Sequence, residues 1–98
     1  MMEDIVYYND LYDIYGSLLT DKQKAYFEDY YFNNLSFSEM AENYGVSRNA
    51  IFKQLHIVLE KLKEYDAKLG LLEKNKAILK LIDKVSDKAL KDELEKLI

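Results

Sequence analysis

Five polar residues lie in the nine-residue stretch that follows Ser47: Arg48, Asn49, Lys53, Gln54 and His56. Arg and Lys side chains pair with the edge of guanine, and Asn and Gln side chains pair with the edge of adenine. At the start of a helix, such residues can contact base edges in a groove of nucleic acid. The same residues could also form the solvated polar face of an ordinary surface helix, so the pattern alone leaves both interpretations open.

The elements around these residues have the pattern of a helix-turn-helix. In the sequence SFSEMAENYGVSRNAIFKQLHIVLEKLKEY, Ser36 and Glu39 have the spacing of a capping box, which predicts a helix over residues 37–43. Ser47 is the N-cap expected for a second helix over residues 48–68. The connection between the two helices is about three residues long, as in a helix-turn-helix corner.

The corner needs particular residue types, and the sequence has them. Ala41 is small where the second helix crosses the first at close range, and Gly45 permits a positive φ at the corner. Val46 and Ile51 are apolar, and we expect their side chains to lock the two helices together. This agreement favours a helix-turn-helix over the alternative, a plain helical hairpin.

Composition predicts helix for the rest of the chain as well. The 98 residues include no proline and three glycines, so few residues interrupt helices and an all-α fold is expected. We expect Gly16 to close the first helix in a left-handed conformation and Ser86 to cap the last helix. The predicted helices lie near residues 3–15, 21–32, 37–43, 48–68, 71–84 and 87–97, with no strand.

The chain is predicted to divide into two parts. Residues 1–70 form the helix-turn-helix domain, and residues 71–98 form a C-terminal helical extension. A helix of about a dozen residues is marginal in water, so the apolar side of the extension must be buried by the same chain or by a second copy. We expect a homodimer through this extension, because two-fold pairing is the commonest oligomer. The last helix is expected to turn Ala89, Leu90, Leu94 and Leu97 inward.

Several classes of protein are excluded by composition. The chain has no cysteine and one histidine, so no metal site or catalytic triad can be drawn, and we expect no cofactor and no enzymatic activity. No apolar run approaches the roughly 18 residues of a membrane span. The start of the chain, MMEDIVYYNDLYD, is acidic where a signal peptide is basic. These features predict a cytoplasmic protein without a membrane span.

Charge is distributed unevenly along the chain, whose formal net charge is −4. Residues 1–35 carry a net charge of −5, residues 36–70 are neutral, and residues 71–98 carry +1. A strong binder of duplex nucleic acid usually has a clear basic patch, because neutralising phosphates supplies most of the non-specific affinity. The neutral middle segment permits binding of nucleic acid but does not favour tight binding.

A set of short motifs is shared with one protein family. The motifs are Tyr15-Gly16-Ser17-Leu18-Leu19-Thr20 with Lys22-Gln23, Glu28-Asp29-Tyr30-Tyr31, Leu35-Ser36 with Glu39 and Ala41, Gly45 to Arg48 with Ala50, and Lys68-Leu69-Gly70. Over residues 7–75 the sequence resembles the YlxM family of small bacterial proteins. The resemblance implies a fold like the DNA-binding region 4 of bacterial primary sigma factors, unrelated to the winged helix. It also implies a regulatory or accessory role in the signal recognition particle pathway, without catalysis.

Two functions follow from these observations. In the first, the chain is a helix-turn-helix module that binds DNA or the RNA of the signal recognition particle through the five polar residues after Ser47. In the second, the same fold is a protein–protein adaptor that docks on the targeting GTPase and binds no nucleic acid. The polar edge of the second motif helix favours the first function, and the acidic residues 1–35 favour the second.

Overall fold

The computed structural model describes residues 4–98, and in this range it is all-helical with no strand, as the sequence predicts. The elements, in order, are α1 (Ile5–Tyr15), the 3₁₀ turn η1 (Gly16–Leu18), α2 (Asp21–Tyr31), α3 (Phe37–Tyr44), α4 (Arg48–Leu69), α5 (Leu71–Ile82) and α6 (Lys88–Glu95). The predicted beginning of the first helix at residue 3 lies outside the described residues. Every other predicted helix has its observed counterpart within a few residues.

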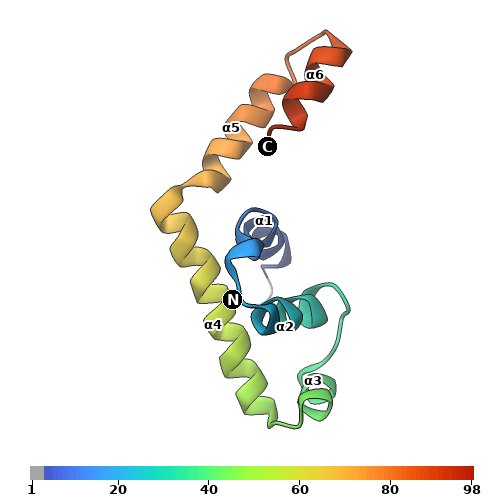
Figure 1. Cartoon of the computed structure of the whole chain (residues 1–98), viewed down its shortest axis with the longest axis vertical. Coiled ribbons are helices and arrows are strands. Elements are labelled where there is room, and N and C mark those ends of the chain that lie inside the picture. The colour runs from blue at the N-terminus through green and yellow to red at the C-terminus, as the bar shows by residue number, and fades with distance from the viewer. Residues whose placement is uncertain (1–3) are drawn as a thin grey trace.

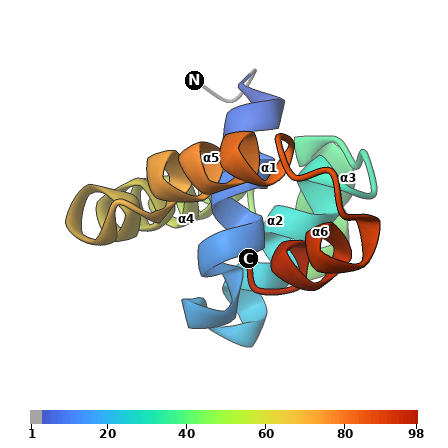
Figure 2. The ribbon, with the colours of Figure 1, turned by 90° about the horizontal axis from the view of Figure 1, so that it is seen from above.

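The long helix α4 contacts α1, α2 and α3, and α1 crosses it (Figures 1 and 2). One side of α4 packs against α1 and α2 in the main hydrophobic core. The buried members of this core are Tyr8, Leu11, Tyr15, Leu19, Phe27, Val58, Leu59, Leu62 and Leu72. Burial of about ten large apolar side chains is the main source of stability for a domain of this size.

Partly buried acid–phenol hydrogen bonds connect α2 to the helices before and after it. The hydroxyl of Tyr12 on α1 donates to Glu28 on α2. The hydroxyl of Tyr44 on α3 donates to Asp29 on α2 over 2.6 Å. A hydrogen bond to a charged acceptor is stronger than one between neutral groups, so these bonds fix how α2 meets its two neighbours.

Two sequence predictions about helix ends are wrong. Gly16 has φ −55° and ψ −34°, which is right-handed, and the chain continues from it into η1. A Cβ at Gly16 would lie 3.1 Å from the ring of Tyr12, so the glycine permits a close approach of this ring and does not form a left-handed turn. The last helix is capped by Asp87 and not by Ser86, because the Asp87 carboxylate accepts a hydrogen bond from the amide of Leu90.

Residues 71–98, which comprise α5 and α6, form an arm that leaves the body of the molecule. Gly70 is left-handed, with φ 63°, and redirects the chain between α4 and α5. The amide of Leu71 donates to the hydroxyl of Tyr15 over 3.1 Å, and this hydroxyl in turn donates to Asp66. The amide of Leu72 donates to the same Asp66 oxygen. These bonds hold the beginning of the arm against α1.

The arm and the α3–α4 corner lie at opposite ends of an elongated molecule (Figure 1). The extents of the chain are 53 × 26 × 23 Å, and its radius of gyration is 16.5 Å. A compact domain of this length would have a radius of about 13 Å. Within residues 4–98 no helix is long and apolar enough to cross a membrane.

Of the two alternatives for the apolar side of the last helix, burial by the same chain is not what the described residues show. None of the residues of α6 is buried, and Leu90 and Leu97 are 47% and 81% exposed. The reason is that α6 packs mainly on α5, and the hairpin they form extends away from the α1–α4 body of the molecule (Figure 1).

Candidate nucleic-acid interface

The first helix of the corner, α3, begins with a complete capping box. The amide of Glu39 donates to the Ser36 hydroxyl over 3.1 Å, and the amide of Ser36 donates to the Glu39 carboxylate over 3.0 Å. Two amides that the helix leaves without partners are thereby satisfied. Eight residues are too few for a stable helix in isolation, so this cap matters for holding α3 in place.

The turn between α3 and α4 is made by Gly45, Val46 and Ser47. Gly45 is left-handed, with φ 67° and ψ 36°, and the amide of Val46 donates to the carbonyl of Ala41 over 3.0 Å. The Ser47 hydroxyl accepts a hydrogen bond from the amide of Ala50 and so caps α4. The chain therefore ends one helix and begins the next within three residues, as the sequence predicts.

A small hydrophobic cluster holds α3 against α4. Ala41 and Ile51 are both buried in it, together with Tyr26 of α2 and Met40. Ala41 is small at the helix crossing, as predicted. The prediction for Val46 is wrong, since its side chain is 42% exposed and only its backbone takes part in the turn. Ile51 alone supplies the apolar contact that the sequence assigned to both residues.

The polar residues predicted to meet nucleic acid lie mostly on one side of α4. Residues three and four apart share a helix face, which places Asn49, Lys53 and His56 together, while Arg48, the first residue of α4, shares the neighbouring side with Phe52. The side chains of Arg48, Asn49 and Lys53 are exposed. Within residues 4–98 neither Arg48 nor Lys53 has an ion-pair partner, so both charges are available to phosphate.

Gln54 and His56 differ from the other predicted site residues. Gln54 is exposed, but it is turned by about 100° from Lys53 around the helix and shares its side with Ala50 and Ile57. His56 is half-buried, and its Nδ1 atom is buried without a hydrogen-bond partner among the described residues. The structure therefore brings Asn49 and Lys53 together as exposed groups, with Arg48 exposed on the neighbouring side of the first turn and Gln54 on the side beyond Lys53.

Phe52 lies on this surface but is not among the five predicted site residues. Its side chain is 44% exposed, and its ring lies parallel to that of His56, with 6.3 Å between the ring centroids. On its inner side it meets the ring of Phe37 edge-on. Its place between Arg48 and His56 follows from the i, i+4 spacing, which was the available signal.

Negative charge on α3 lies next to this surface. Glu39 and Glu42 are exposed on α3, the helix that crosses the backbone of the nucleic acid in a helix-turn-helix complex. These carboxylates repel phosphate and oppose the two cations of α4. The electrostatic attraction of the corner for nucleic acid is therefore weak.

Other chemistry has no support at the described residues. No group of three or more metal-ligating side chains lies close enough together to hold a metal ion within residues 4–98. The strongly shifted groups are two half-buried tyrosines that pack against the hydrophobic clusters. Burial, and then the hydrogen bond to Asp29, raise the pKa of Tyr44 to about 12. Burial and the contact with Glu28 raise the pKa of Tyr12 further above its usual value. These hydroxyls are held neutral as donors within the fold.

Comparison with known proteins places the corner in a family context. A family model described as "Putative helix-turn-helix protein, YlxM / p13 like" (UPF0122) matches residues 2–98. A UPF0122 protein of Caldanaerobacter subterraneus subsp. tengcongensis is 39% identical over 87 residues, which cover 89% of this chain and 74% of the relative. A UPF0122 protein of Fusobacterium nucleatum subsp. nucleatum is 38% identical over 98 residues, covering all of this chain and 95% of the relative. A UPF0122 protein of Listeria innocua serovar 6a is 40% identical, covering 91% of this chain and 89% of the relative.

Proposed function

The chain belongs to the UPF0122 family of YlxM/p13-like helix-turn-helix proteins, and from this premise we propose that it binds nucleic acid through the first two turns of α4. The proposal rests on one observation: a fully formed corner presents three exposed polar side chains, Arg48, Asn49 and Lys53, in the first two turns of α4. In this proposal the protein is a cytoplasmic regulatory or accessory factor without catalytic activity or cofactor, and it acts as a homodimer.

Two features of α4 support contact with phosphate. The N-terminus of a helix carries unpaired amides and a partial positive charge, which together attract an anion. Ser47 satisfies only one of these amides, that of Ala50. Arg48 and Lys53 add full charges next to the same end, and Asn49 lies between them with an amide that can pair with adenine.

The expected affinity is low. Two cations neutralise few phosphates, and Glu39 and Glu42 oppose them. Non-specific binding at physiological salt should therefore be no tighter than roughly 10⁻⁴ M. A structured ligand that offers shape as well as charge fits this surface better than random duplex. The resemblance to YlxM supports the RNA of the signal recognition particle as one such ligand and a specific DNA site as the other.

Fluorescence anisotropy with labelled duplex DNA and labelled structured RNA at low salt tests the proposal. The variant Arg48→Ala/Lys53→Ala should lose binding to whichever ligand the parent binds. Lys68→Ala/Lys74→Ala is the matched control, because it removes the same charge from exposed positions far from the corner. Absence of binding by the parent at low salt, or equal loss in both variants, would refute the proposal.

The adaptor function is the second candidate, and the acidic surface of α1 and α2 favours it. Asp13 and Asp21 are exposed there, and residues 1–35 carry a net charge of −5. In this case the chain would dock on the GTPase of the signal recognition particle pathway and leave the α4 surface unused. Binding to the purified GTPase that Asp13→Asn/Asp21→Asn weakens and Arg48→Ala/Lys53→Ala does not would favour the adaptor.

A further inference from the structure

Phe52 is an exposed ring that other aromatic side chains support from the inside. The ring of Phe37 meets it edge-on, with 6.1 Å between the centroids, and Phe37 in turn stacks on Tyr30 of α2. One helical turn further along α4, the ring of His56 lies within 14° of parallel to it. Nearly half of the Phe52 side chain nevertheless faces solvent. Because its neighbours already orient the ring, a ligand that stacks on it immobilises little more of the protein.

The side chains one turn before Phe52 suit the other two parts of a nucleotide. Arg48 and Asn49 precede Phe52 by four and three residues, so both border it on the surface of α4. The guanidinium of Arg48 is exposed and has no ion-pair partner within residues 4–98, so it can bind a phosphate. The exposed amide of Asn49 offers a donor and an acceptor to the edge of a base. A base that stacks on Phe52 therefore has a cation and an amide within one helical turn.

A second exposed phenylalanine, Phe32, has the opposite surroundings. Its side chain is 51% exposed at the end of α2, and its ring also packs edge-on against other rings. The residues three and four positions before it are Asp29 and Glu28, whose carboxylates repel phosphate. Of these two exposed rings, Phe52 alone has polar neighbours that suit a nucleotide.

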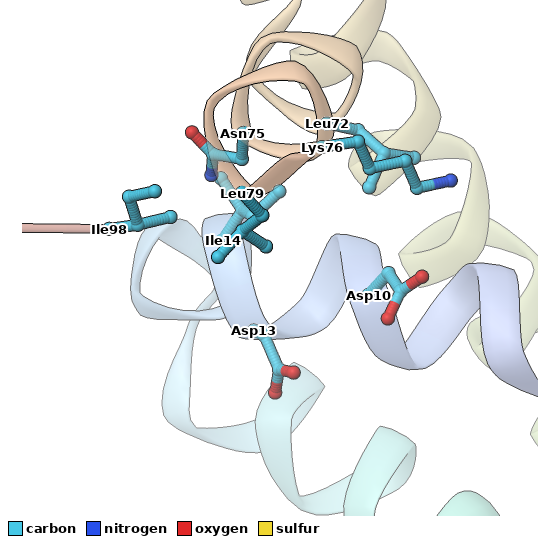
Figure 3. A pocket seen from close by; sticks show the side chains of 8 residues that line it. All are labelled: Asp10, Asp13, Ile14, Leu72, Asn75, Lys76, Leu79 and Ile98. Atoms are coloured by element: carbon cyan, nitrogen blue, oxygen red, sulfur yellow. The ribbon is translucent and has the colours of Figure 1, made fainter. Parts of the chain in front are cut away.

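The groove between α1 and α5 is also less suited to a nucleotide (Figure 3). It has a volume of about 470 Å³, and no aromatic ring is among the residues that line it. Asp10 and Asp13 line it from α1, and Lys76 is its single cation. Two carboxylates against one ammonium group disfavour phosphate, so the surface around Phe52 is the better site.

The charge of the corner is too small to hold nucleic acid tightly by phosphate contacts alone. Arg48 and Lys53 supply two cations, and the carboxylates of Glu39 and Glu42 oppose them. Stacking of a base on an aromatic side chain does not require a net charge, and it strengthens binding by about 5- to 150-fold per base. The surface therefore favours a ligand that has a base with a free face over one that offers only a dense row of phosphates.

We propose that Phe52 is a stacking platform for an unpaired base, with Arg48 on the adjoining phosphate and Asn49 on the edge of the base. In a duplex the faces of the bases are covered by their neighbours, whereas loops, bulges and single strands present bases that can stack on aromatic side chains. This proposal rests on the proposed function, nucleic-acid binding at α4, and narrows its ligand to one with unpaired nucleotides. A duplex of DNA would use Phe52 in another way, since a phenylalanine in the major groove contacts the methyl group of thymine.

Fluorescence anisotropy of the full chain at low salt tests the proposal with three labelled probes. These are an RNA hairpin with an unpaired loop, a DNA hairpin of the same sequence, and a blunt duplex of the same stem. The parent should bind a hairpin about tenfold more tightly than the duplex, and the hairpin that binds more tightly identifies RNA or DNA as the source of the base. Phe52→Ala should lose this preference and keep the weak affinity for the duplex. Phe52→Tyr should retain the preference, because tyrosine also has an aromatic face.

Two further variants separate stacking from a structural role of the ring. Phe52→Leu keeps an apolar side chain against Phe37 but has no aromatic face, so it should have the helix content of the parent by circular dichroism and lose the hairpin preference. Phe32→Ala is the matched control and should bind all probes as the parent does, because its ring contacts are with Tyr12 and Phe27 and not with the corner.

The outcomes distinguish this proposal from the proposed function. Equal affinity of the parent for hairpin and duplex, or equal hairpin affinity of the parent and Phe52→Leu, would overturn the stacking platform. Weaker binding of Phe52→Ala to the DNA duplex, matched in the parent when uracil replaces thymine, would assign the ring to a thymine methyl group and overturn it as well. These results leave nucleic-acid binding at α4 standing, since Arg48→Ala/Lys53→Ala tests it separately. A parent that binds none of the three probes would overturn both proposals.

Discussion

Ala41→Leu should disrupt the corner on which the proposed function depends. Ala41 is 8% exposed and packs with Tyr26, Met40 and Ile51, which are all 3% exposed or less. No space is available for three more carbon atoms, so the larger side chain must push α3 away from α4. Overpacking of this kind typically costs about 1–3 kcal/mol. For a domain of this length, that corresponds to a fall of about 4 to 24 °C in melting temperature.

Thermal denaturation followed by circular dichroism measures this effect. Ala67→Leu is the matched control, because Ala67 is exposed on α4 and the same change there should alter stability by no more than about 0.5 kcal/mol. The buried variant should also lose the nucleic-acid binding that the control retains. If Ala41→Leu melted at the same temperature as Ala67→Leu, the close crossing of α3 and α4 would be refuted.

Three further substitutions test the turn, the acid–phenol bonds and the beginning of the arm. Gly45→Ala should lower the free energy of unfolding, measured by chemical denaturation, by about 1–2 kcal/mol. The cost is backbone strain alone, because φ is 67° and no atom lies near the added Cβ. Gly45→Asn should cost less, because asparagine adopts a positive φ more readily. Tyr44→Phe removes the bond to Asp29 and should cost about 1–3 kcal/mol. The pKa of Tyr44 is raised from 10.0 to about 12, so its hydrogen bond contributes fully to the free energy of unfolding below pH 10 and loses this contribution as the pH rises to 12. The free energy of unfolding of Tyr44→Phe should therefore fall less steeply than that of the parent between pH 10 and 12. Tyr15→Phe leaves the amide of Leu71 without its acceptor and should speed hydrogen exchange at that amide about tenfold, without a change at the corner.

Local hydrogen bonds explain why the corner could be predicted from the sequence. The caps of Ser36 and Ser47 join groups three residues apart, so the residue types and their spacing are sufficient to find them. Gly45 is likewise recognisable, because few other residues adopt its positive φ.

Contacts between distant residues explain what could not be predicted. Tyr44 and Asp29 are 15 residues apart and meet only because α3 folds back on α2. Valine is usually buried, so its residue type predicts a core position for Val46. Only the angle between α3 and α4 turns this side chain to the solvent. The spacing of the leucines in α6 correctly predicts a helix with one apolar side. No local pattern indicates whether the same chain or another copy covers that side.

A salt titration of binding tests the proposed role of α4 most directly. The affinity of the parent for structured RNA or a DNA duplex is measured by anisotropy between about 20 and 200 mM salt, beside Arg48→Ala/Lys53→Ala and Lys68→Ala/Lys74→Ala. Each phosphate contact contributes close to one unit to the slope of log affinity against log salt. We expect the parent to bind weakly, with a slope that falls by about two units in Arg48→Ala/Lys53→Ala and is unchanged in the control. Equal slopes in all three proteins would contradict a nucleic-acid interface at α4.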